Sequence, residues 1–527
     1  MCSARRVALA LLVVLVGVPV VAPTAARADL LSRALTALTD TEDGTGGGGA
    51  PPPPDDLLAW AGSARPTSLP ELLQVAAKSA PSLATASIDI DIAQARIQQT
   101  MSRDDWTLQG QLYASSSSGF FSGLRIDRST VIGGVFDATR TLPTGGTIRL
   151  HAGSEYSRTT SPLNSEVVLG NWTDELNVTY VQPLLRGRGR SLYYANERRA
   201  ELAREAAIDG RRLAAINTVQ TIVSAYWDLV LAERQVAITR ASLALAQERL
   251  RITQIGADGG KIPRSEIPAV QQIIATREEE ILNAELAVLD RSIALRRAAG
   301  MPIGAGELGL RVETSLDTRD ATWDLGELTE RAFAASPELA QLAKQDAATK
   351  IDIEVTENGL LPRLDAALTL GPRSQSESAT TALRDLARID SFAISGSLSF
   401  EQSIGREAVR GQLRELRDSQ RQLEVTAFDI RAQIAQAMAR AVAQLELAKR
   451  RIDLSERAIE LAKENIRIET DRFNLGRATN FDVLNRQEEL RQAELRRSQA
   501  MVDWHKAESV VMALTGDILP EYGIDLR

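Results

Sequence analysis

Two histidines and one cysteine are the only residues of their kinds in this 527-residue chain, and they limit the chemistry it can perform. His151 stands in a stretch that alternates like a strand, and His505 in a stretch with helical periodicity. No catalytic triad, metal-ligand cluster, phosphate-binding loop or dinucleotide-binding fingerprint accompanies them. The sequence therefore predicts neither an enzyme nor a cofactor or metal site.

Basic residues gather at one place, the run Arg-Gly-Arg-Gly-Arg at 186–190. This run joins a predicted strand to a predicted helix, and no aromatic residues that could stack on bases are interleaved in it. Elsewhere Arg and Glu alternate along predicted helices, and the formal net charge is −8. Because binding to phosphates requires a concentrated basic face, we expect no nucleic-acid partner.

The first 28 residues have the pattern of a secretory signal peptide, with a basic start, an apolar run at 7–21 and Ala26-Arg27-Ala28 before the expected cleavage site. A membrane anchor is the alternative, but the run is short and contains Pro19. Cys2 lies within this segment. The mature chain is thus expected to lack disulfides and an N-terminal lipid anchor.

The rest of the chain divides by composition and by internal repetition. Residues 29–67 include a Gly-rich and Pro-rich stretch and are expected to be a flexible segment. A first repeat at 68–303, a linker at 304–323, a second repeat at 324–516 and a tail at 517–527 follow. The 4% aromatic content favours long helices over a compact globular core.

The repeat rests on two registers. Pro81 matches Pro337 at an offset of 256, whereas Gly189 matches Gly405 at an offset of 216. A tandem duplication accounts for both registers if the first copy carries 40 extra residues between Leu108 and Gly189. Strand-like alternation falls in that same window.

Very long helices are predicted at 191–255 and 402–471, the second about 100 Å long at 1.5 Å per residue. In the second helix, apolar or small residues keep a spacing of three and four, with one irregular step near Ala441, which is typical of a coiled-coil face. These residues are at 413, 416, 423, 427, 430, 434, 437, 441, 445, 448, 452, 459, 462 and 466.

Four segments alternate between an apolar and a small or polar side, as half-buried strands do: 106–118, 172–183, 364–370 and 392–402. A soluble β-sandwich would alternate in the same way. The accompanying secretion signal, aromatic strand ends and long rods favour a membrane β-barrel with a polar lumen. The fold class predicted is mainly α with a transmembrane β-barrel.

The 40 extra residues carry two more alternating segments, 131–142 and 147–156, joined by a Pro-Thr-Gly-Gly turn. A trimer would close twelve strands without this hairpin and eighteen with it, and the sequence leaves both open. The longer loops expected beside the hairpin are 119–129 and 158–171.

These features together resemble the TolC-like outer-membrane efflux protein family over nearly all of 66–516. The resemblance is carried by the duplicated opening and by three further segments: VQPLLRGRGR at 181–190, SAYWDLVLAERQV at 224–236 and DRFNLGRATNFDVLNRQEEL at 471–490. It implies a homotrimer in the outer membrane of a Gram-negative bacterium. It also implies an exit duct for a periplasmic adaptor protein and an inner-membrane pump of a tripartite efflux or type I secretion system.

By the same resemblance, the turns at 256–267 and 473–485 are periplasmic tips that meet the adaptor and constrict the tunnel. Gly260 and Gly476 can reverse the backbone, and Ser265 and Asn480 are candidate caps of the returning helices. Lys261 and Thr479 complete the tip turns that are expected to contact the adaptor. Ordinary helix punctuation would explain much of this pattern as well.

Asp482 stands where the family places an acidic residue at the inner constriction, and Glu266 occupies the matching place in the first repeat. Three copies of an acid around one axis would repel each other and attract cations. Phe473, Arg477 and Asn485 complete the expected constriction. Arg477 stands one place before the position of a basic gate residue in relatives, where this chain has Ala478, so the charge lock of relatives is expected to be absent or rearranged.

A periplasmic coiled-coil adaptor or scaffold is the other class considered, because it would share the signal and the rods. Paired strand sets at the same place in two repeats argue against it. The exported substrate and the class of pump stay open.

Overall fold

The computed structural model describes residues 66–121, 124–160, 170–260, 262–303, 309–313, 318–319 and 322–524. The predicted signal peptide, nearly all of the segment 29–67, Lys261, much of the linker 304–323 and the last three residues of the tail lie outside the described residues. The description below concerns the unit Leu57–Arg527. Among its described residues, no helix has both the length and the hydropathy needed to cross a membrane.

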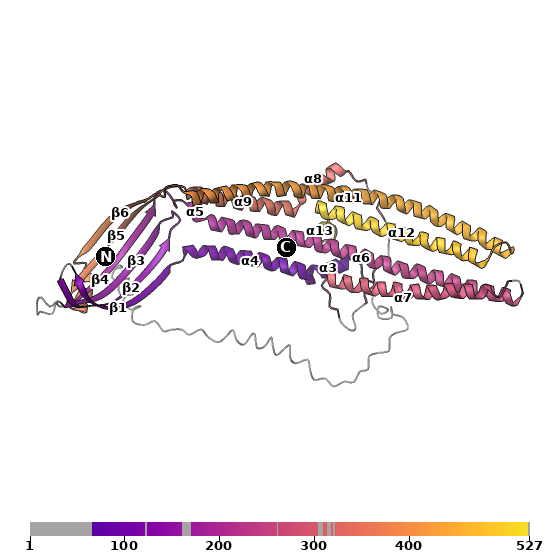
Figure 1. The fold of residues 1–527 in the computed structure, drawn as a ribbon, viewed down its shortest axis with the longest axis horizontal. Coiled ribbons are helices and arrows are strands. Elements are labelled where there is room, and N and C mark those ends of the chain that lie inside the picture. The colour runs from indigo at the N-terminus through magenta and orange to yellow at the C-terminus, as the bar shows by residue number, and fades with distance from the viewer. Residues whose placement is uncertain are drawn as a thin grey trace, which may run out of the picture. The chain divides into compact units, whose positions relative to one another are not determined.

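The elements follow one another in the same order twice (Figure 1). The first pass comprises α3 (Leu69–Ser79), α4 (Pro81–Met101), the 3-10 turn η2 (Ser102–Asp104), strands β1 to β4, α5 (Arg190–Tyr193), α6 (Ala195–Asp258) and α7 (Glu266–Ala298). The second comprises α8 (Leu325–Ala335), α9 (Pro337–Asn358), β5, α10 (Ala379–Arg388), β6, α11 (Glu407–Asn474), α12 (Asn480–Thr515) and α13 (Ile518–Glu521).

The lengths of the corresponding helices agree closely. They are 11 and 11 residues for α3 and α8, 21 and 22 for α4 and α9, 64 and 68 for α6 and α11, and 33 and 36 for α7 and α12. Pro81 and Pro337 both stand in the first turn, where the missing N–H of proline costs no hydrogen bond. The structure thus repeats as the sequence does, while the exact domain boundaries remain a prediction.

The helices pack in a single layer. Beside the sheet, the neighbours run in the order α4, α6, α9 and α11, and beyond the middle of the unit they run α7, α6, α12 and α11. The long helices α6 and α11 therefore pass through both halves, whereas each other helix covers only one half. The coiled-coil face predicted on α11 is confirmed, because all fourteen of its positions are buried or half-buried.

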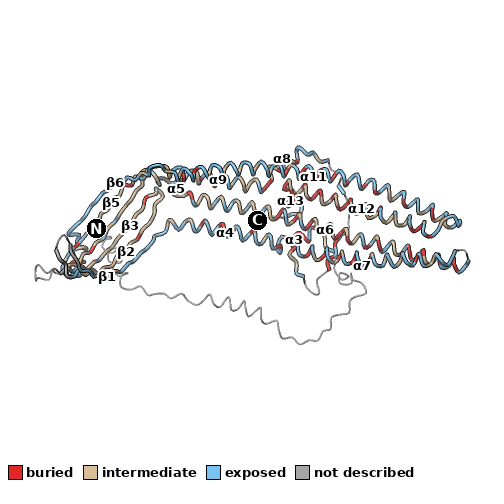
Figure 2. Tube along the Cα trace, in the orientation of Figure 1, coloured by how far each residue is buried: buried red, intermediate tan, exposed pale blue. Residues whose placement is uncertain are grey.

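Two apolar clusters hold this layer together where the short helices join it, and buried segments are visible there in Figure 2. The first unites α3, α6, α7 and α13 around Leu72, Ile222, Leu295 and Ile518. The second unites α8, α11 and α12 around Met438 and Trp504, among others. Burial of a large aliphatic side chain contributes about 1.5–3 kcal/mol, so these clusters fix the middle of the unit.

One six-stranded antiparallel sheet has the order β1-β2-β3-β4-β5-β6. Its strands are β1 (Thr107–Phe121), β2 (Leu124–Thr141), β3 (Thr147–Thr160), β4 (Asn171–Pro183), β5 (Arg363–Ser376) and β6 (Phe392–Glu401). The extra hairpin is β2 and β3, which stand between β1 and β4.

The predicted loop at 119–129 is wrong, because β1 and β2 extend through most of it. Of the predicted loop at 158–171, residues 161–169 lie outside the described part of the chain.

The register gives the sheet two chemically different faces. Each paired position joins residues of equal parity, apart from the end of the β1–β2 ladder beyond Ser117. Because directly opposed residues share a face, even-numbered residues form one face and odd-numbered residues the other. The even face is mostly apolar, including Leu108, Leu112, Phe136, Leu150, Leu176, Val178, Leu368, Leu370, Ile394, Leu398 and Phe400.

Helix α10, between β5 and β6, was not predicted. It packs against β4 and β5, and its Ala382 is fully buried. The Ser374 hydroxyl donates to the Ala382 carbonyl oxygen at 2.7 Å, and the neighbouring Asp174 carboxylate accepts from Ser154 at 2.6 Å. Asp174, Ser154 and Ser374 are polar exceptions on the even face, and both Asp174 and Ser374 are buried.

Candidate functional site

The turn between α6 and α7 forms the first predicted tip. Gly260 has φ +69°, and its N–H donates to the Ala257 carbonyl at 3.1 Å, which closes the end of α6. The reversal predicted at Gly260 is confirmed. Ser265 precedes α7, but its side chain makes no cap hydrogen bond, so the predicted capping by Ser265 is wrong. Glu266 is the first residue of α7 and is half-buried.

The turn between α11 and α12 forms the second predicted tip. The Gly476 N–H donates to the Phe473 carbonyl at 2.9 Å, and the Arg477 N–H donates to the Arg472 carbonyl at 2.8 Å. These are the two hydrogen bonds of a Schellman motif, which needs a left-handed residue at the place of Gly476. Its φ is +69°, as the predicted reversal requires.

The cap of α12 is Thr479 rather than Asn480. The Asp482 N–H donates to the Thr479 hydroxyl oxygen at 3.3 Å, and the Asp482 carboxylate accepts from the Thr479 N–H and hydroxyl, both at 2.8 Å. This reciprocal pair is a capping box, with Asp in the place usually held by Glu or Gln. Asn480 is instead the first helical residue and is 1% exposed, so its predicted capping role is wrong.

The capping box also fixes the charge of Asp482. Hydrogen bonds from the Thr479 backbone, and then from its hydroxyl, hold the pKa of Asp482 below its usual range. Both hydrogen bonds from Thr479 end on Oδ2 of Asp482, which leaves Oδ1 available for another partner. Asp482 therefore has a structural role in the single chain, and it remains a candidate for the acidic constriction.

The other predicted constriction residues differ in their surroundings. The ring of Phe473 is half-buried and lies 5.0 Å from the guanidinium of Arg249 on α6, a cation–π contact. Arg249 is buried, and its burial lowers its pKa. Arg477 and Asn485 are exposed. Phe473 thus anchors the second tip to α6.

A charge network that the sequence did not predict joins the two helical hairpins above the tips. Arg277 on α7 donates to Glu488 on α12, and Arg491 on α12 makes two hydrogen bonds to Glu488, at 2.8 and 2.7 Å. Glu280 lies 2.6 Å from Arg277 and 3.8 Å from Arg491. The side chains of Arg277 and Arg491 are only 11% and 14% exposed, so screening by water is limited.

The contacts within this network shift the pKa values of Glu488 and Arg491. Burial alone would raise the pKa of Glu488, but the hydrogen bonds from Arg491 and Gln492 and the charges of Arg491 and Arg277 outweigh burial and lower it. The hydrogen bond from Arg491 to Glu488 likewise raises the pKa of Arg491. Both shifts favour the charged forms of Glu488 and Arg491, and the network ties α7 to α12 within one chain.

The odd face of the sheet carries a second polar cluster, built largely by the extra hairpin. His151 on β3 lies between two carboxylates, with Nδ1 at 2.9 Å from Asp137 on β2 and Nε2 at 3.1 Å from Glu175 on β4. Beside it, the Tyr113 hydroxyl on β1 donates to Glu155 at 2.8 Å. These side chains tie the four strands of the first repeat together across this face.

The model of the outer membrane efflux protein family matches residues 147–301, from the start of β3 to just beyond α7. No curated protein matches the chain in sequence. Several solved structures share its fold. The outer-membrane channel OprN aligns with a TM-score of 0.64 at 15% identity, covering 85% of this chain and 90% of that one.

Two further structures have nearly the same likeness. The CmeC outer membrane channel of Campylobacter jejuni aligns with a TM-score of 0.62 at 14% identity, covering 85% of each chain. The outer membrane protein VceC of Vibrio cholerae aligns with a TM-score of 0.62 at 15% identity, covering 85% of this chain and 96% of that one.

The fold of the chain is that of the TolC-like outer-membrane channels, a helical barrel segment joined to a β-barrel segment. Residues 147–301 are similar to the outer membrane efflux protein domain, in line with the resemblance noted in the sequence. The family is one of channels rather than enzymes and belongs to the outer membrane.

Proposed function

We propose that three copies of this chain form an exit duct that spans the outer membrane and continues into the periplasm as a helical tunnel. The duct would receive substrates from an inner-membrane pump through a periplasmic adaptor protein and release them outside the cell. The similarity of residues 147–301 to the outer membrane efflux protein domain supports the general role as an efflux channel. The trimer, the gate and the partners are our proposal.

The observation that supports this proposal most directly is that the six-stranded sheet has two unpaired edges. Among the described strands, β1 pairs only with β2 and β6 pairs only with β5, so each edge leaves a row of backbone N–H and C=O groups unpaired. All ten residues of β6 are exposed. A spanning sheet must close because unpaired backbone groups are costly in lipid. Pairing of β1 with β6 of the next copy would close eighteen strands from three copies of six.

The even face has the properties of a surface in contact with lipid. Its aromatic residues gather at both ends, with Trp106 and Phe400 near the helices and Tyr156 and Trp172 at the far end, where the last two rings are 5.3 Å apart. Trp172 and Tyr180 stand eight residues apart on β4, about 27 Å at 3.4 Å per residue. Membrane barrels carry an apolar band of about 25 Å between aromatic girdles.

The helical layer also has open apolar edges that a neighbouring copy would cover. On α11, residues spaced by seven are exposed although apolar: Leu447, Leu454, Leu461 and Ile468, followed just past the helix end by Leu475. This heptad stripe lies apart from the face that packs on α12. The opposite edge offers Ile88 and Ile92 on α4 and Leu282 and Leu286 on α7. Contact between these edges would close a ring of helices.

We place the gate at the two tips, above which the Arg277–Glu488 network limits separation of α7 from α12. Asp482 and Glu266 would supply acidic groups near the axis, and Phe473, Arg477 and Asn485 would shape the constriction. The turns with Gly260, Lys261, Ser265, Gly476, Thr479 and Asn480 would form the adaptor contact. Asn480 is buried within its own chain and would act through the shape of the turn.

Fractionation and conductance test this proposal together. The full chain should sediment with outer membranes, migrate faster unheated than heated on SDS gels as folded barrels do, and have the mass of a trimer in detergent. It should also conduct as a single trimeric pore in planar bilayers. A protein that is released as a soluble monomer after signal cleavage would rule out the duct.

A further inference from the structure

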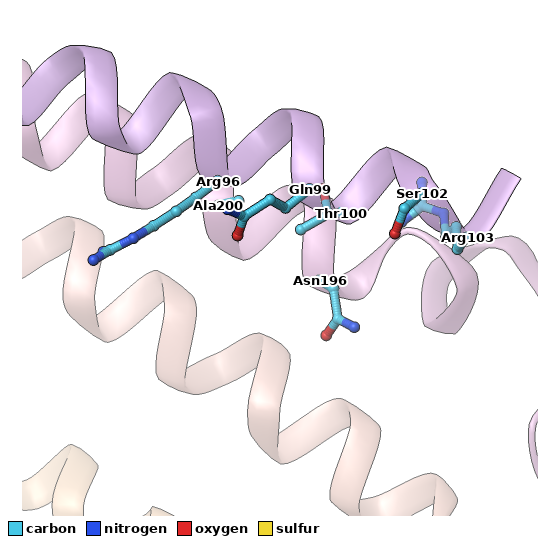
Figure 3. A pocket seen from close by; sticks show the side chains of 7 residues that line it. All are labelled: Arg96, Gln99, Thr100, Ser102, Arg103, Asn196 and Ala200. Carbon is cyan, nitrogen blue, oxygen red and sulfur yellow. The ribbon is translucent and has the colours of Figure 1, made fainter. Parts of the chain in front are cut away.

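A pocket of about 430 Å³ lies where the end of α4 faces the start of α6, beside the first residues of the sheet (Figure 3). Arg96, Gln99, Thr100 and Arg103 line it from one side at the spacing of a single helix face, with Ser102 beside them. Asn196 and Ala200 line it from α6. The lining contains two guanidinium groups and no carboxylate.

Arg103 is held firmly at one end of the pocket. Its guanidinium lies 4.5 Å from the centre of the Tyr193 ring and 4.6 Å from that of Tyr194, and its Nη2 donates to Glu197. Its Nε and Nη1 are shielded from solvent and have no hydrogen-bond partner. The side chain is 17% exposed. Glu197 therefore compensates the charge of this cation, but not its hydrogen-bonding capacity.

The neighbouring side chains differ in what they offer the pocket, because Thr100 already donates its hydroxyl proton to the Ile97 carbonyl oxygen at 2.7 Å. Asn196 accepts from Arg199 through Oδ1, so its Nδ2 is left to donate towards the pocket. Arg96 is exposed, and no hydrogen bond or ion pair is found for it among the described residues. Figure 3 shows Arg96 and Arg103 towards opposite ends of the row, with Gln99 and Thr100 between them and Asn196 on the facing helix. The pocket thus offers charged and neutral donors to an anion.

The position of the pocket narrows the identity of that anion. Only Asp104 and Asp105 separate Arg103 from Trp106, the aromatic residue that begins the apolar face. Tyr193 and Tyr194 lie at the same level. If the sheet spans the outer membrane, as the proposed function holds, this level is that of the lipid headgroups on the periplasmic side. Guanidinium groups beside aromatic residues suit a headgroup phosphate.

We infer that this pocket binds the phosphate group of a phospholipid from the periplasmic leaflet, with Arg96 as the cation that reaches the phosphate and Arg103, paired with Glu197, as the fixed wall at the other end. The phosphate binding rests on the pocket itself, whereas its source in a lipid rests on the proposed function. A bound headgroup would pin the end of α4 to the membrane surface where the helical layer meets the sheet.

Native mass spectrometry of the detergent-purified full chain tests this inference with dioleoyl phosphatidylglycerol. Dioleoylglycerol, which has the same acyl chains and no phosphate, is the lipid control. Wild type should retain phosphatidylglycerol and not dioleoylglycerol. Arg96→Gln should weaken retention about ten-fold, since a charge-assisted hydrogen bond is lost. Arg414→Gln, at an exposed arginine near the sheet end of α11, should retain lipid as wild type does.

Asn196→Asp is a second variant, since it keeps the acceptor for Arg199 and turns the donor into a repelling charge. It should weaken retention at least as much as Arg96→Gln.

Equal retention by wild type and both pocket variants would overturn the inference. Competition by inorganic phosphate at similar affinity would overturn the lipid assignment. Conductance of the same preparations separates the two hypotheses. Conducting trimers that retain no phosphatidylglycerol would refute the lipid site alone, whereas a preparation without pores would refute the duct.

Discussion

Arg277 of α7 donates a hydrogen bond to Glu488 of α12, across 211 residues of sequence and between the two helical hairpins that end in the tips. Arg491 holds the same carboxylate from its own helix. Glu488 therefore contacts two largely buried cations, and Glu280 supplies the second negative charge beside them. Movement that separates α7 from α12 must break the contacts of Arg277 with Glu488 and of Arg491 with Glu280, although each arginine keeps an acid on its own helix. Glu488 makes the closer of these two links, so its removal should matter most.

Glu488→Gln should loosen the contact between α7 and α12. The change leaves Arg277 and Arg491 with Glu280 as the remaining acid, and we expect a loss of about 1–3 kcal/mol in stability. Single-channel conductance in planar bilayers should rise, and hydrogen exchange in α7 and α12 near the tips should become faster. Glu489→Gln is the matched control, because Glu489 is half-exposed and its ion pair is with Arg486 on its own helix. Equal effects of the two variants would contradict the role of the network.

Lowering the pH should weaken the contact that Glu488 makes between α7 and α12. The pKa of Glu488 is lowered in the folded chain, so its stabilising contribution is complete above the ordinary pKa of glutamate, about 4.3, and is lost as the pH falls further through the folded value. We expect wild-type conductance to increase only at a pH below that ordinary value, as the pH falls through the lowered pKa at which Glu488 of the folded chain becomes protonated. Glu488→Gln should respond less over that range. Parallel pH curves for the two proteins would exclude Glu488 as the titrating group.

The capping role of Asp482 and its proposed role in the constriction can be separated. Thr479→Ala removes the cap of α12 and should lower stability by about 0.5–2 kcal/mol, while the charge of Asp482 remains. Asp482→Asn removes the charge and should weaken block of the channel by divalent cations or raise its conductance. Block that Thr479→Ala weakens as much as Asp482→Asn does would assign the effect to helix capping rather than to an acidic ring.

Two glycines of the second repeat should respond oppositely to alanine. At Gly476 the backbone has φ +69° and no atom lies within 4 Å of an added Cβ, so strain in the left-handed region is the only cost, about 1 kcal/mol. Gly411 stands inside α11 with equal space around it, and Gly411→Ala should stabilise the helix by about 0.5–1 kcal/mol. Thermal unfolding of the two variants should shift in opposite directions. A shift in the same direction would contradict the reversal at Gly476.

Local periodicity predicted the helices well, because each turn of a coiled coil repeats the same information. The helix predicted at 402–471 is α11, Glu407–Asn474, and the helix predicted at 191–255 is α6, Ala195–Asp258. The cap of α12 was misplaced by one residue, since Thr479 and Asn480 are both good capping residues. Asp482 three places after Thr479 is the signal of a capping box that identifies the right one.

Contacts between segments that lie far apart in the chain have no comparable signal in the sequence. Alternation assigned residues of the sheet to two faces, but it does not say which strands are neighbours, so the place of the hairpin stayed open until β2 and β3 were found between β1 and β4. Arg277 and Glu488 each resemble ordinary solvated helix residues in sequence. The ten residues of α10 are too few to give a clear period between two strands.

The two faces of the sheet give the sharpest test of its orientation in the membrane. Leu112 lies on the even face of β1 and is 87% exposed in the single chain, while Gln111 beside it lies on the odd face and is also exposed. If the even face meets lipid, Leu112→Arg should destabilise the barrel by about 2–4 kcal/mol, because the charge would lie in the hydrocarbon region.

Gln111→Arg adds the same charge one residue away and should fold as wild type does, because the odd face would line an aqueous lumen. Its effect should be on conductance and ion selectivity instead. Folding into lipid vesicles, followed by urea titration and by migration of unheated samples on SDS gels, measures the first property, and planar bilayers measure the second. Destabilisation by Gln111→Arg rather than by Leu112→Arg would mean that the faces are reversed, and with them the assignment of His151, Asp137 and Glu175 to the lumen.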